Sequence, residues 1–452
     1  MFRFARPVRR QCRRGLPVPG SLAPSSLSPD RRIASERPTG IDDRENQNEV
    51  PCAMKKLYAI AAAIVLNTAA LLVAVNVVAA FFVADRDDGP IEYSSAMLIE
   101  RYGFDVLKKA YPGWTDENLR VLLTESSNWL LEYEPFTQFR PATRSDTYIT
   151  IDPAGFRVSP PQGPWPPDKD AINLFVFGSS TTMGAGMPDV GTIPARLQAR
   201  IHSDCRTRVN VYNFGRGLYF STQERILFAQ LLLSGVKPDM AVFVDGMTEF
   251  YYPDGTPELT ARLSAFIEAA NHAKVPRQKK QEGFASAFIR MLEALPAYRL
   301  LQESGMTWLT PARAAEFEAP AGGEAAARAV VERWRTNRRM IQAVATAFEV
   351  PVLFAWAPGP TYGYDIDHMN LQKAGKLDFG RLALSATGYR QMAELHAGGE
   401  LGEDFLWLGD MQRGVRENLY VDAAHYDAAF SSRIADALFD RLVERHPFVC
   451  MP

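Results

Sequence analysis

The strongest constraint on the fold is an apolar strand that ends abruptly in a row of hydroxyl side chains. Residues Ile172 to Phe177 are rich in β-branched and aromatic residues, which is typical of a buried strand. The sequence Gly178-Ser-Ser-Thr-Thr-Met-Gly184 follows, and apolar residues then recur at helical spacing from about Thr192 to Asp204. Such a strand places its last residues at the carboxyl edge of a sheet, where open α/β folds bind their ligands. The hydroxyl cluster is therefore a candidate site.

Strands and helices continue to alternate along the rest of the chain. Further strands are predicted at Arg208 to Tyr212, Met240 to Val244, Val350 to Trp356 and Phe405 to Leu408, and helices at Ser221 to about Ser234, Glu324 to Phe348 and Ala428 to Arg445. This alternation predicts a parallel sheet with helices on both faces. The pattern is least regular between residues 250 and 345, where helical stretches at Glu258 to Ala270 and Phe284 to Glu303 predict a helical insertion.

The helix that follows the second strand has a recognisable start. Ser221-Thr-Gln-Glu224 has the spacing of a capping box, in which the serine and glutamate side chains each accept a backbone N–H at the helix start. The sequence therefore predicts Ser221 as the capping residue.

The N-terminal part of the chain includes a long apolar run. Residues 1 to 53 are rich in Arg, Pro and Ser, which is typical of disorder, or of a segment upstream of a true start at Met54. Leu57 to Val83 carries no charge and exceeds the roughly 20 residues that span a bilayer. Lysines precede this run and aspartates follow it. By the positive-inside rule, residues 54 to 85 are predicted to be an uncleaved signal-anchor with the rest of the chain outside the cytoplasm.

Residues 86 to 169 separate the predicted anchor from the first strand of the α/β domain. Asp116 to Tyr133 carries leucines at helical spacing, and Thr147 to Ile151 alternates like a strand. Ser159 to Asp170 contains five prolines and is predicted to be a stiff linker. We expect residues 86 to 169 to form a membrane-proximal cap and linker beside an α/β domain at residues 170 to 452.

The composition argues against several classes of function. The formal net charge of -2 gives no indication of a nucleic-acid partner. The chain has six histidines and four cysteines, without a Cys-x-x-Cys or His-x-x-x-His spacing. We therefore predict no metal site.

Two motifs resemble those of a known enzyme family. Gly178 to Gly184 resembles the first block of the SGNH, or GDSL-type, hydrolases, G-D-S-x-T-x-G, although the family's aspartate is replaced by Ser179. Near the other end of the chain, Asp422-Ala-Ala-His425 precedes the last predicted helix and resembles the family's last block, D-x-x-H. The resemblance implies a flavodoxin-like three-layer α/β/α sandwich without a metal or cofactor.

The same resemblance assigns roles to three side chains. It implies that Ser180 is a nucleophile, that His425 is the base that takes its proton, and that Asp422 orients the base. The residues alone leave two alternatives open, namely that Asp422 caps the last helix and that His425 is a surface histidine.

The donors of an oxyanion hole are less clearly marked. The resemblance implies the backbone N–H of Ser180 and a glycine N–H after the second strand, where Gly215 and Gly217 follow Asn213 and the register is ambiguous. These glycines could equally serve only to make a tight turn. The family's third block, G-x-N-D, appears with Thr248 in place of its asparagine, so that a hydroxyl stands where an amide is expected.

The motifs and the predicted anchor lead to one main functional hypothesis. The chain is expected to be a membrane-anchored, extracytoplasmic serine esterase that removes acyl groups, above all O-acetyl, from a carbohydrate or lipid of the cell envelope. It would span the inner (cytoplasmic) membrane once through residues 57 to 83. The alternatives are an O-acyltransferase acting on an envelope polysaccharide and a glycan-binding or scaffold protein without catalysis. No protein partner is predicted.

Only Cys205 and Cys450 lie beyond the predicted anchor. In a flavodoxin-like sheet of strand order 2-1-3-4-5, right-handed crossovers place the first and last helices on the same face. Cys205 follows the first of these helices and Cys450 the last, so both are expected at the sheet edge opposite the candidate site. Their Cα atoms are then predicted to lie about 4.4–6.8 Å apart, within reach of a disulfide, unless the two residues are unrelated thiols.

Overall fold

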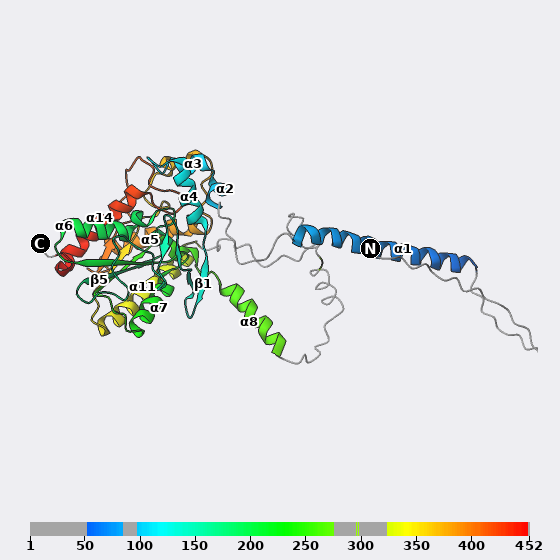
Figure 1. The fold of residues 1–452 in the computed structure, drawn as a ribbon, viewed down its shortest axis with the longest axis horizontal. Coiled ribbons are helices and arrows are strands. Elements are labelled where there is room, and N and C mark those ends of the chain that lie inside the picture. The colour runs from blue at the N-terminus through cyan, green and yellow to red at the C-terminus, as the bar shows by residue number, and fades with distance from the viewer. Residues whose placement is uncertain (1–51, 85–96, 275–294, 296, 298–322, 451–452) are drawn as a thin grey trace, which may run out of the picture. The chain divides into compact units, whose positions relative to one another are not determined.

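A five-stranded parallel sheet carries the fold of the computed structural model, which describes residues 52–84, 97–274, 295, 297 and 323–450 (Figure 1). The strands are β5 (Ile172–Gly178), β6 (Val209–Gly215), β7 (Met240–Asp245), β8 (Val352–Trp356) and β9 (Phe405–Trp407). Their order is β6-β5-β7-β8-β9, and all neighbouring pairs are parallel. Numbered along the chain this is 2-1-3-4-5, which confirms the predicted parallel sheet and its flavodoxin-like order.

Helices cover both faces of the sheet (Figure 1). On one face lie α6 (Ile193–Asp204) and α14 (Ala428–Arg445), and on the other lie α7 (Ser221–Leu233), α11 (Gly323–Ala347) and α13 (Ser385–Ala397). Alternate residues of β5 serve the two faces, because side chains along a strand point to opposite sides. Leu174 packs with α6 and α14, whereas Phe175 packs in the cluster of the other face. The predicted three-layer α/β/α fold is therefore confirmed.

A row of aromatic rings fixes the register of four strands. Phe177 on β5 stands opposite Phe214 on β6 and Phe243 on β7, and Phe243 stands opposite Phe354 on β8. The rings stack with centroids 5.6, 4.8 and 5.3 Å apart in that order along the row. All four side chains are buried, and each contributes about 1.5–3 kcal/mol by leaving water. This row of rings holds the carboxyl ends of the four strands at one edge of the sheet.

The segment before the sheet packs against that edge. It contains α2 (Met97–Tyr102), α3 (Phe104–Lys108), α4 (Asp116–Ser127), the hairpin β1 (Leu131–Glu134) and β2 (Gln138–Pro141), and the short pair β3 (Arg144–Ser145) and β4 (Thr150–Ile151). Leu107, Leu119 and Leu122 of its helices form a buried cluster with Met187 and Val421 of the α/β domain. The predicted helix to Tyr133 is wrong beyond Ser127, and the predicted strand from Thr147 is shorter.

The predicted capping box at Ser221 is also wrong. The helix α7 begins there, but its N-cap is Phe220, which makes no side-chain cap. Ser221 instead donates its N–H and its hydroxyl to the carboxylate of Glu249, at 2.5 and 3.0 Å. A buried carboxylate from another part of the chain has thus replaced the local partner.

The remaining elements are short or lie in the insertion. They are α5 (Ser180–Met183), α8 (Thr260–Lys274), α12 (Asn370–Lys373) and the 3₁₀ segments Asp189–Gly191, Met247–Tyr251, Ile366–His368, Gly380–Leu384 and Pro447–Val449. The predicted helix at Glu258 to Ala270 corresponds to α8, whereas the one at Phe284 to Glu303 lies almost entirely outside the described residues. The helix α13 was not predicted from the sequence.

The two cysteines form the predicted disulfide. Cys205 directly follows α6 and Cys450 lies beyond the end of α14, and their Cα atoms are 4.9 Å apart. Cys205 also precedes the first residue of β6, so the bridge lies at the amino edge of the sheet, opposite the carboxyl edge that carries the hydroxyl cluster.

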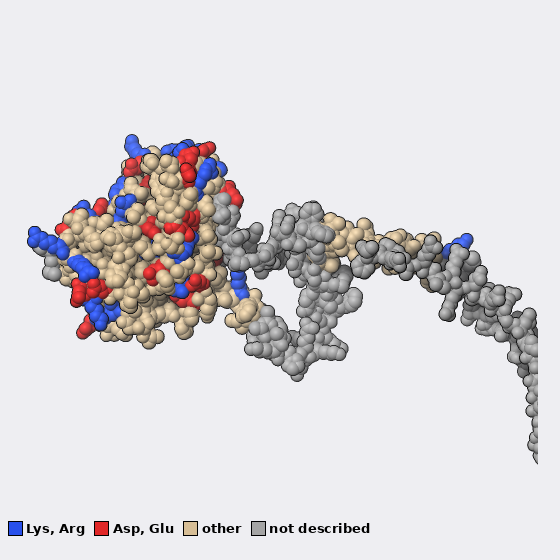
Figure 2. Space-filling model, viewed as in Figure 1, with Lys and Arg blue, Asp and Glu red and all other residues tan. Residues whose placement is uncertain are grey.

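The apolar run forms one continuous helix, α1 (Cys52–Ala84). Within it, Lys56–Val78 has a mean hydropathy of 2.2 and is long and apolar enough to cross a membrane. In Figure 2 the described part of α1 is largely free of charged residues, whereas acidic and basic residues are mixed over the visible face of the α/β domain. Membrane insertion stays a prediction, and residues 1–51 lie outside the described residues.

Candidate active site

Ser180 begins a single helical turn at the carboxyl end of β5. The strand ends at Gly178, where a Cβ atom would lie 2.2 Å from the hydroxyl of Thr182, so only glycine fits. Gly184, with φ +86°, ends the turn in the left-handed conformation that favours glycine. Ser180 is half-buried at the edge of the sheet, whereas Ser179 is buried. The two glycines thus explain how the sequence presents one hydroxyl of the cluster.

The structure brings the three predicted side chains together. The Nε2 atom of His425 lies 2.8 Å from Oγ of Ser180, and its Nδ1 lies 2.7 Å from Oδ2 of Asp422. The other carboxylate oxygen of Asp422 accepts the backbone N–H of Ala424 and of His425, at 2.9 and 2.8 Å. The alternative role for Asp422 is excluded, because the capping residue of α14 is Asp427.

The electrostatics of the pair suit proton transfer. Burial raises the pKa of Asp422, but the charge of His425 and the hydrogen bonds that Asp422 accepts lower it by more. The pKa of Asp422 therefore lies below its ordinary value. Burial lowers the pKa of His425, but the charge and hydrogen bond of Asp422 outweigh this, and the pKa lies above its ordinary value. The imidazole is therefore a stronger base than a free one and is placed to take the proton of Ser180.

The three side chains open into a cavity of about 460 Å³. Its walls come from the segment at residues 97–129 and from the loops that follow β5, β6, β7 and β9, with a further part from residues 378–382. Twelve of the 22 lining residues are apolar or aromatic: Met97, Leu98, Tyr102, Trp129, Ala185, Leu218, Met247, Tyr251, Phe379, Leu382, Ala423 and Ala424. A cavity of this size and lining is typical of a small-molecule site.

The predicted oxyanion donors are distributed unevenly around this cavity. Thr248 lines it. The N–H of Gly215 donates to Oδ1 of Asn213 at 3.0 Å, and Gly217 lies against the ring of Trp129, so neither glycine lines the cavity. Leu218, which has φ +66°, lines it instead. The assignment of Gly215 and Gly217 stays a prediction, and the engaged N–H of Gly215 does not favour it.

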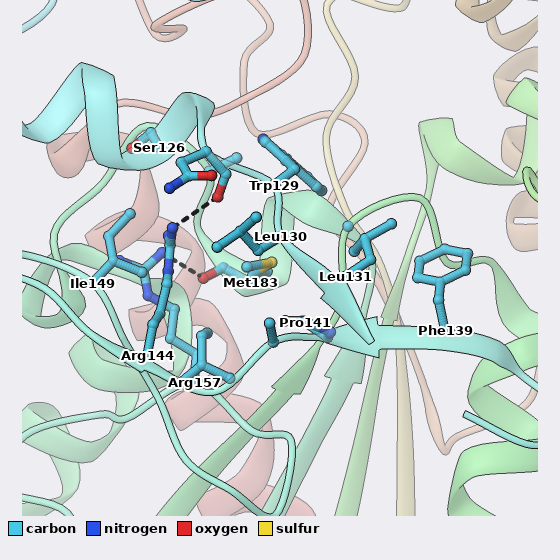
Figure 3. Close-up of a pocket in the computed structure, with 15 residues that line it drawn as sticks. Ser126, Trp129, Leu130, Leu131, Phe139, Pro141, Arg144, Ile149, Arg157 and Met183 are labelled. Atoms are coloured by element: carbon cyan, nitrogen blue, oxygen red, sulfur yellow. Dashed lines mark hydrogen bonds between the residues drawn. The ribbon is translucent and has the colours of Figure 1, made fainter. Parts of the chain in front are cut away.

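A buried arginine, not predicted from the sequence, holds the turn that begins at Ser180. Arg157, only 1% exposed, donates to the backbone oxygen of Met183 at 3.0 Å (Figure 3). It also donates to the backbone oxygens of Gly184 and Met187, at 2.8 and 2.6 Å. Its Nε atom donates to the carboxylate of Asp189 at 2.8 Å. Burial lowers the pKa of Arg157, although Asp189 opposes this shift. No motif marks this residue, because its partners are set by the tertiary fold.

Within the parts of the chain that the structure describes, no group of three or more His, Cys, Asp or Glu side chains is placed to hold a metal ion.

No protein-family model matches this chain, and no curated protein matches it. Among solved structures it is similar to a lipolytic protein of the G-D-S-L family from Desulfitobacterium hafniense, at 10% identity and a TM-score of 0.30, over 60% of this chain and 99% of that chain.

Two further solved structures are similar to a comparable degree. One is a carbohydrate acetylesterase family member from Sinorhizobium meliloti, with 12% identity and a TM-score of 0.29 over 60% of this chain and 97% of that chain. The other is a lipase/acylhydrolase from Enterococcus faecalis, with 11% identity and a TM-score of 0.31 over 60% of this chain and 96% of that chain.

Proposed function

We propose that the protein is a serine ester hydrolase of the SGNH type, with Ser180 as nucleophile, His425 as general base and Asp422 as the group that orients the base. The observation that carries this proposal is the hydrogen-bonded relay from Asp422 through His425 to Ser180, which opens into a largely apolar cavity. A serine hydroxyl is a weak nucleophile unless a positioned base takes its proton, and this relay supplies that base.

The proposed reaction has two halves. The Oγ atom of Ser180 attacks the ester carbonyl carbon while its proton moves to Nε2 of His425, and Asp422 stabilises the imidazolium. His425 then gives this proton to the departing alcohol oxygen, which leaves the acyl group on Ser180. Water, deprotonated by the same imidazole, attacks the acyl-enzyme, releases the carboxylic acid and restores the serine hydroxyl.

Thr248 is proposed to donate to the oxyanion that forms in each half, because it lines the same cavity as Ser180. Loss of one such donor costs about 10²–10³ in rate in other serine hydrolases. Thr248→Val should therefore lower kcat more than it changes KM, because the contact is made chiefly in the transition state. Thr248→Asn should keep or raise kcat, since an amide reaches further.

Steady-state kinetics on an activated acetyl ester test this prediction. Thr181→Val is a matched control, because Thr181 lines the same cavity but its hydroxyl lies 3.1 Å from that of Ser179. An unchanged kcat in Thr248→Val would remove Thr248 from the mechanism.

The proposed substrate is an acylated carbohydrate or lipid, with O-acetyl as the expected acyl group. We further propose a single-pass inner-membrane protein, with an anchor at residues 54–85, a cap at residues 86–169 and a catalytic α/β domain at residues 170–452 outside the cytoplasm. The apolar helix α1 supports the anchor. The disulfide supports the location, because disulfides persist in oxidising compartments.

Acyl release by the detergent-solubilised full chain tests the proposed function. We expect a fluorophosphonate probe to label the protein and acetate to be released from O-acetylated glycans. Mass spectrometry of an added polysaccharide, with an activated acetyl ester as donor, separates hydrolysis from transfer. Acetyl groups found on the glycan would favour the O-acyltransferase. Absence of both labelling and turnover would contradict catalysis and favour a binding or scaffold protein.

A further inference from the structure

A small inner cavity lies beside the active-site cavity. The two cavities share the residues Ser126, Trp129 and Ala185, so they have a common wall. Figure 3 shows the inner cavity, with Ser126 and Trp129 labelled in its lining. The inner cavity has a volume of about 20 Å³, which is room for little more than one water molecule or methyl group. Apolar side chains such as Leu131 and Ile149 line much of it. The common wall therefore separates a roomy site from a small, mainly apolar space.

Trp129 is the large side chain in this wall, and the surrounding structure fixes its place. A Cβ atom on Gly217 would lie 1.5 Å from the indole ring, so the ring lies directly against the glycine backbone. The preceding residue is also anchored, because Arg144 donates to the carbonyl of Asn128 at 2.7 Å and to that of Glu125 at 3.1 Å. The indole is thus held between a glycine and an anchored chain.

The chemistry of the relay decides which part of an ester lies near this wall. The alcohol oxygen leaves with a proton from Nε2 of His425, so the alcohol part must lie beside residues 422–425. The acyl chain extends from the carbonyl carbon in a different direction from the alcohol, so it lies along a different wall of the cavity. Trp129 and Ala185 line the cavity outside residues 422–425. The N–H of Ala185 donates to the carbonyl of Ser180 at 3.0 Å.

We propose that Trp129 closes the acyl subsite of this enzyme and restricts it to acetyl and similarly short acyl groups. The inference rests on the proposed esterase function and deepens it by naming the substrate class. A longer acyl chain would need the volume that the indole occupies and the inner cavity beyond it. Removing the indole joins the two cavities and gives such a chain an apolar place to lie.

Acyl-chain selectivity tests this role. The full chain in detergent is assayed with p-nitrophenyl acetate, butyrate and hexanoate, and kcat/KM is expressed per active site labelled by fluorophosphonate. The unsubstituted protein should prefer acetate. In Trp129→Ala the ratio of acetate to hexanoate rates should fall by about tenfold or more, because each buried methylene then gains contact energy. Trp129→Phe should lie between the two.

Leu130→Ala is the matched control, because Leu130 neighbours Trp129 and lines the inner cavity but not the active-site cavity. It should leave the preference for acetate unchanged. An unchanged preference in a Trp129→Ala protein that still labels would overturn the proposal. So would an equal shift in Leu130→Ala, since the inner cavity would then already hold the acyl chain.

Misfolding of the variant and failure of the proposed function can both be distinguished from failure of the proposed acyl subsite. If Trp129→Ala does not label because it does not fold, Trp129→Phe, which keeps a smaller ring against Gly217, decides the question by the same ratio. If the unsubstituted protein neither labels nor turns over any ester, the proposed function fails first, and the acyl subsite fails with it.

Discussion

Replacing Ser180 with alanine is expected to abolish hydrolysis of an activated acetyl ester, whereas Ser179→Ala should leave most of it. The hydroxyl of Ser180 lies 2.8 Å from Nε2 of His425, while the hydroxyl of Ser179 lies 3.1 Å from that of Thr181 and is buried. Removal of the nucleophile costs on the order of 10⁶ in kcat in other serine hydrolases. Initial rates and fluorophosphonate labelling of both variants measure the difference.

The two adjacent serines serve as controls for each other. Each substitution removes one hydroxyl from the same turn, so a general loss of folding would affect both variants and would appear in their thermal unfolding. The reverse result, with activity lost in Ser179→Ala and kept in Ser180→Ala, would show that the nucleophile is Ser179.

Removing the disulfide is expected to cost the fold much more than it costs the site. Cys205 and Cys450 are 245 residues apart in sequence, so the bridge closes a loop that includes most of the α/β domain. In the chain-entropy model, so long a loop is worth about 5.5 kcal/mol of unfolding free energy. Denaturant unfolding of the Cys205→Ala, Cys450→Ala double variant should show this loss. Below the transition, kcat/KM should hardly change, because the bridge lies at the opposite edge of the sheet.

A reductant supplies the control for that measurement. It should destabilise the unsubstituted protein and leave the double variant unchanged, and equal unfolding curves for the two proteins would contradict the stabilising role. Alkylation of free thiols in the native membrane fraction, before any reduction, also tests the location. Free Cys205 and Cys450 there would contradict both the bridge and the proposed extracytoplasmic compartment.

The sequence predicts the sheet well because the sheet is built from local signals. The apolar run at Ile172 to Phe177 is buried on both faces of the sheet, so its residues are nearly all apolar and mark the strand without reference to the rest of the chain. The strand order and the meeting of Ser180 with His425 then follow from topology, because the carboxyl ends of parallel strands share one edge. The disulfide was predictable for the same reason at the other edge.

The missed features depend on partners that are distant in sequence. The hairpin strand Leu131–Glu134 carries two glutamates and lacks a strong strand signal, but Glu134 pairs with the buried guanidinium of Arg216. Ser221 has a local capping partner in Glu224 and binds Glu249 instead. Trp129 gains its place from Gly217. Such contacts depend on the tertiary structure and leave no periodic pattern in the sequence.

The position of Arg157 in the chain constrains the order in which the protein can be assembled. During synthesis this arginine emerges before every strand of the parallel sheet, while the hydrogen-bond partners of its guanidinium, from Met183 to Asp189, emerge later. Burying a guanidinium without hydrogen-bond partners is costly. The segment that precedes the sheet therefore cannot adopt its final packing until the turn that begins at Ser180 has formed. A shortened gene product starting at residue 170 would in turn remove the arginine donor from the carbonyl groups of Met183, Gly184 and Met187. The smallest autonomous catalytic unit therefore includes the segment that precedes the sheet.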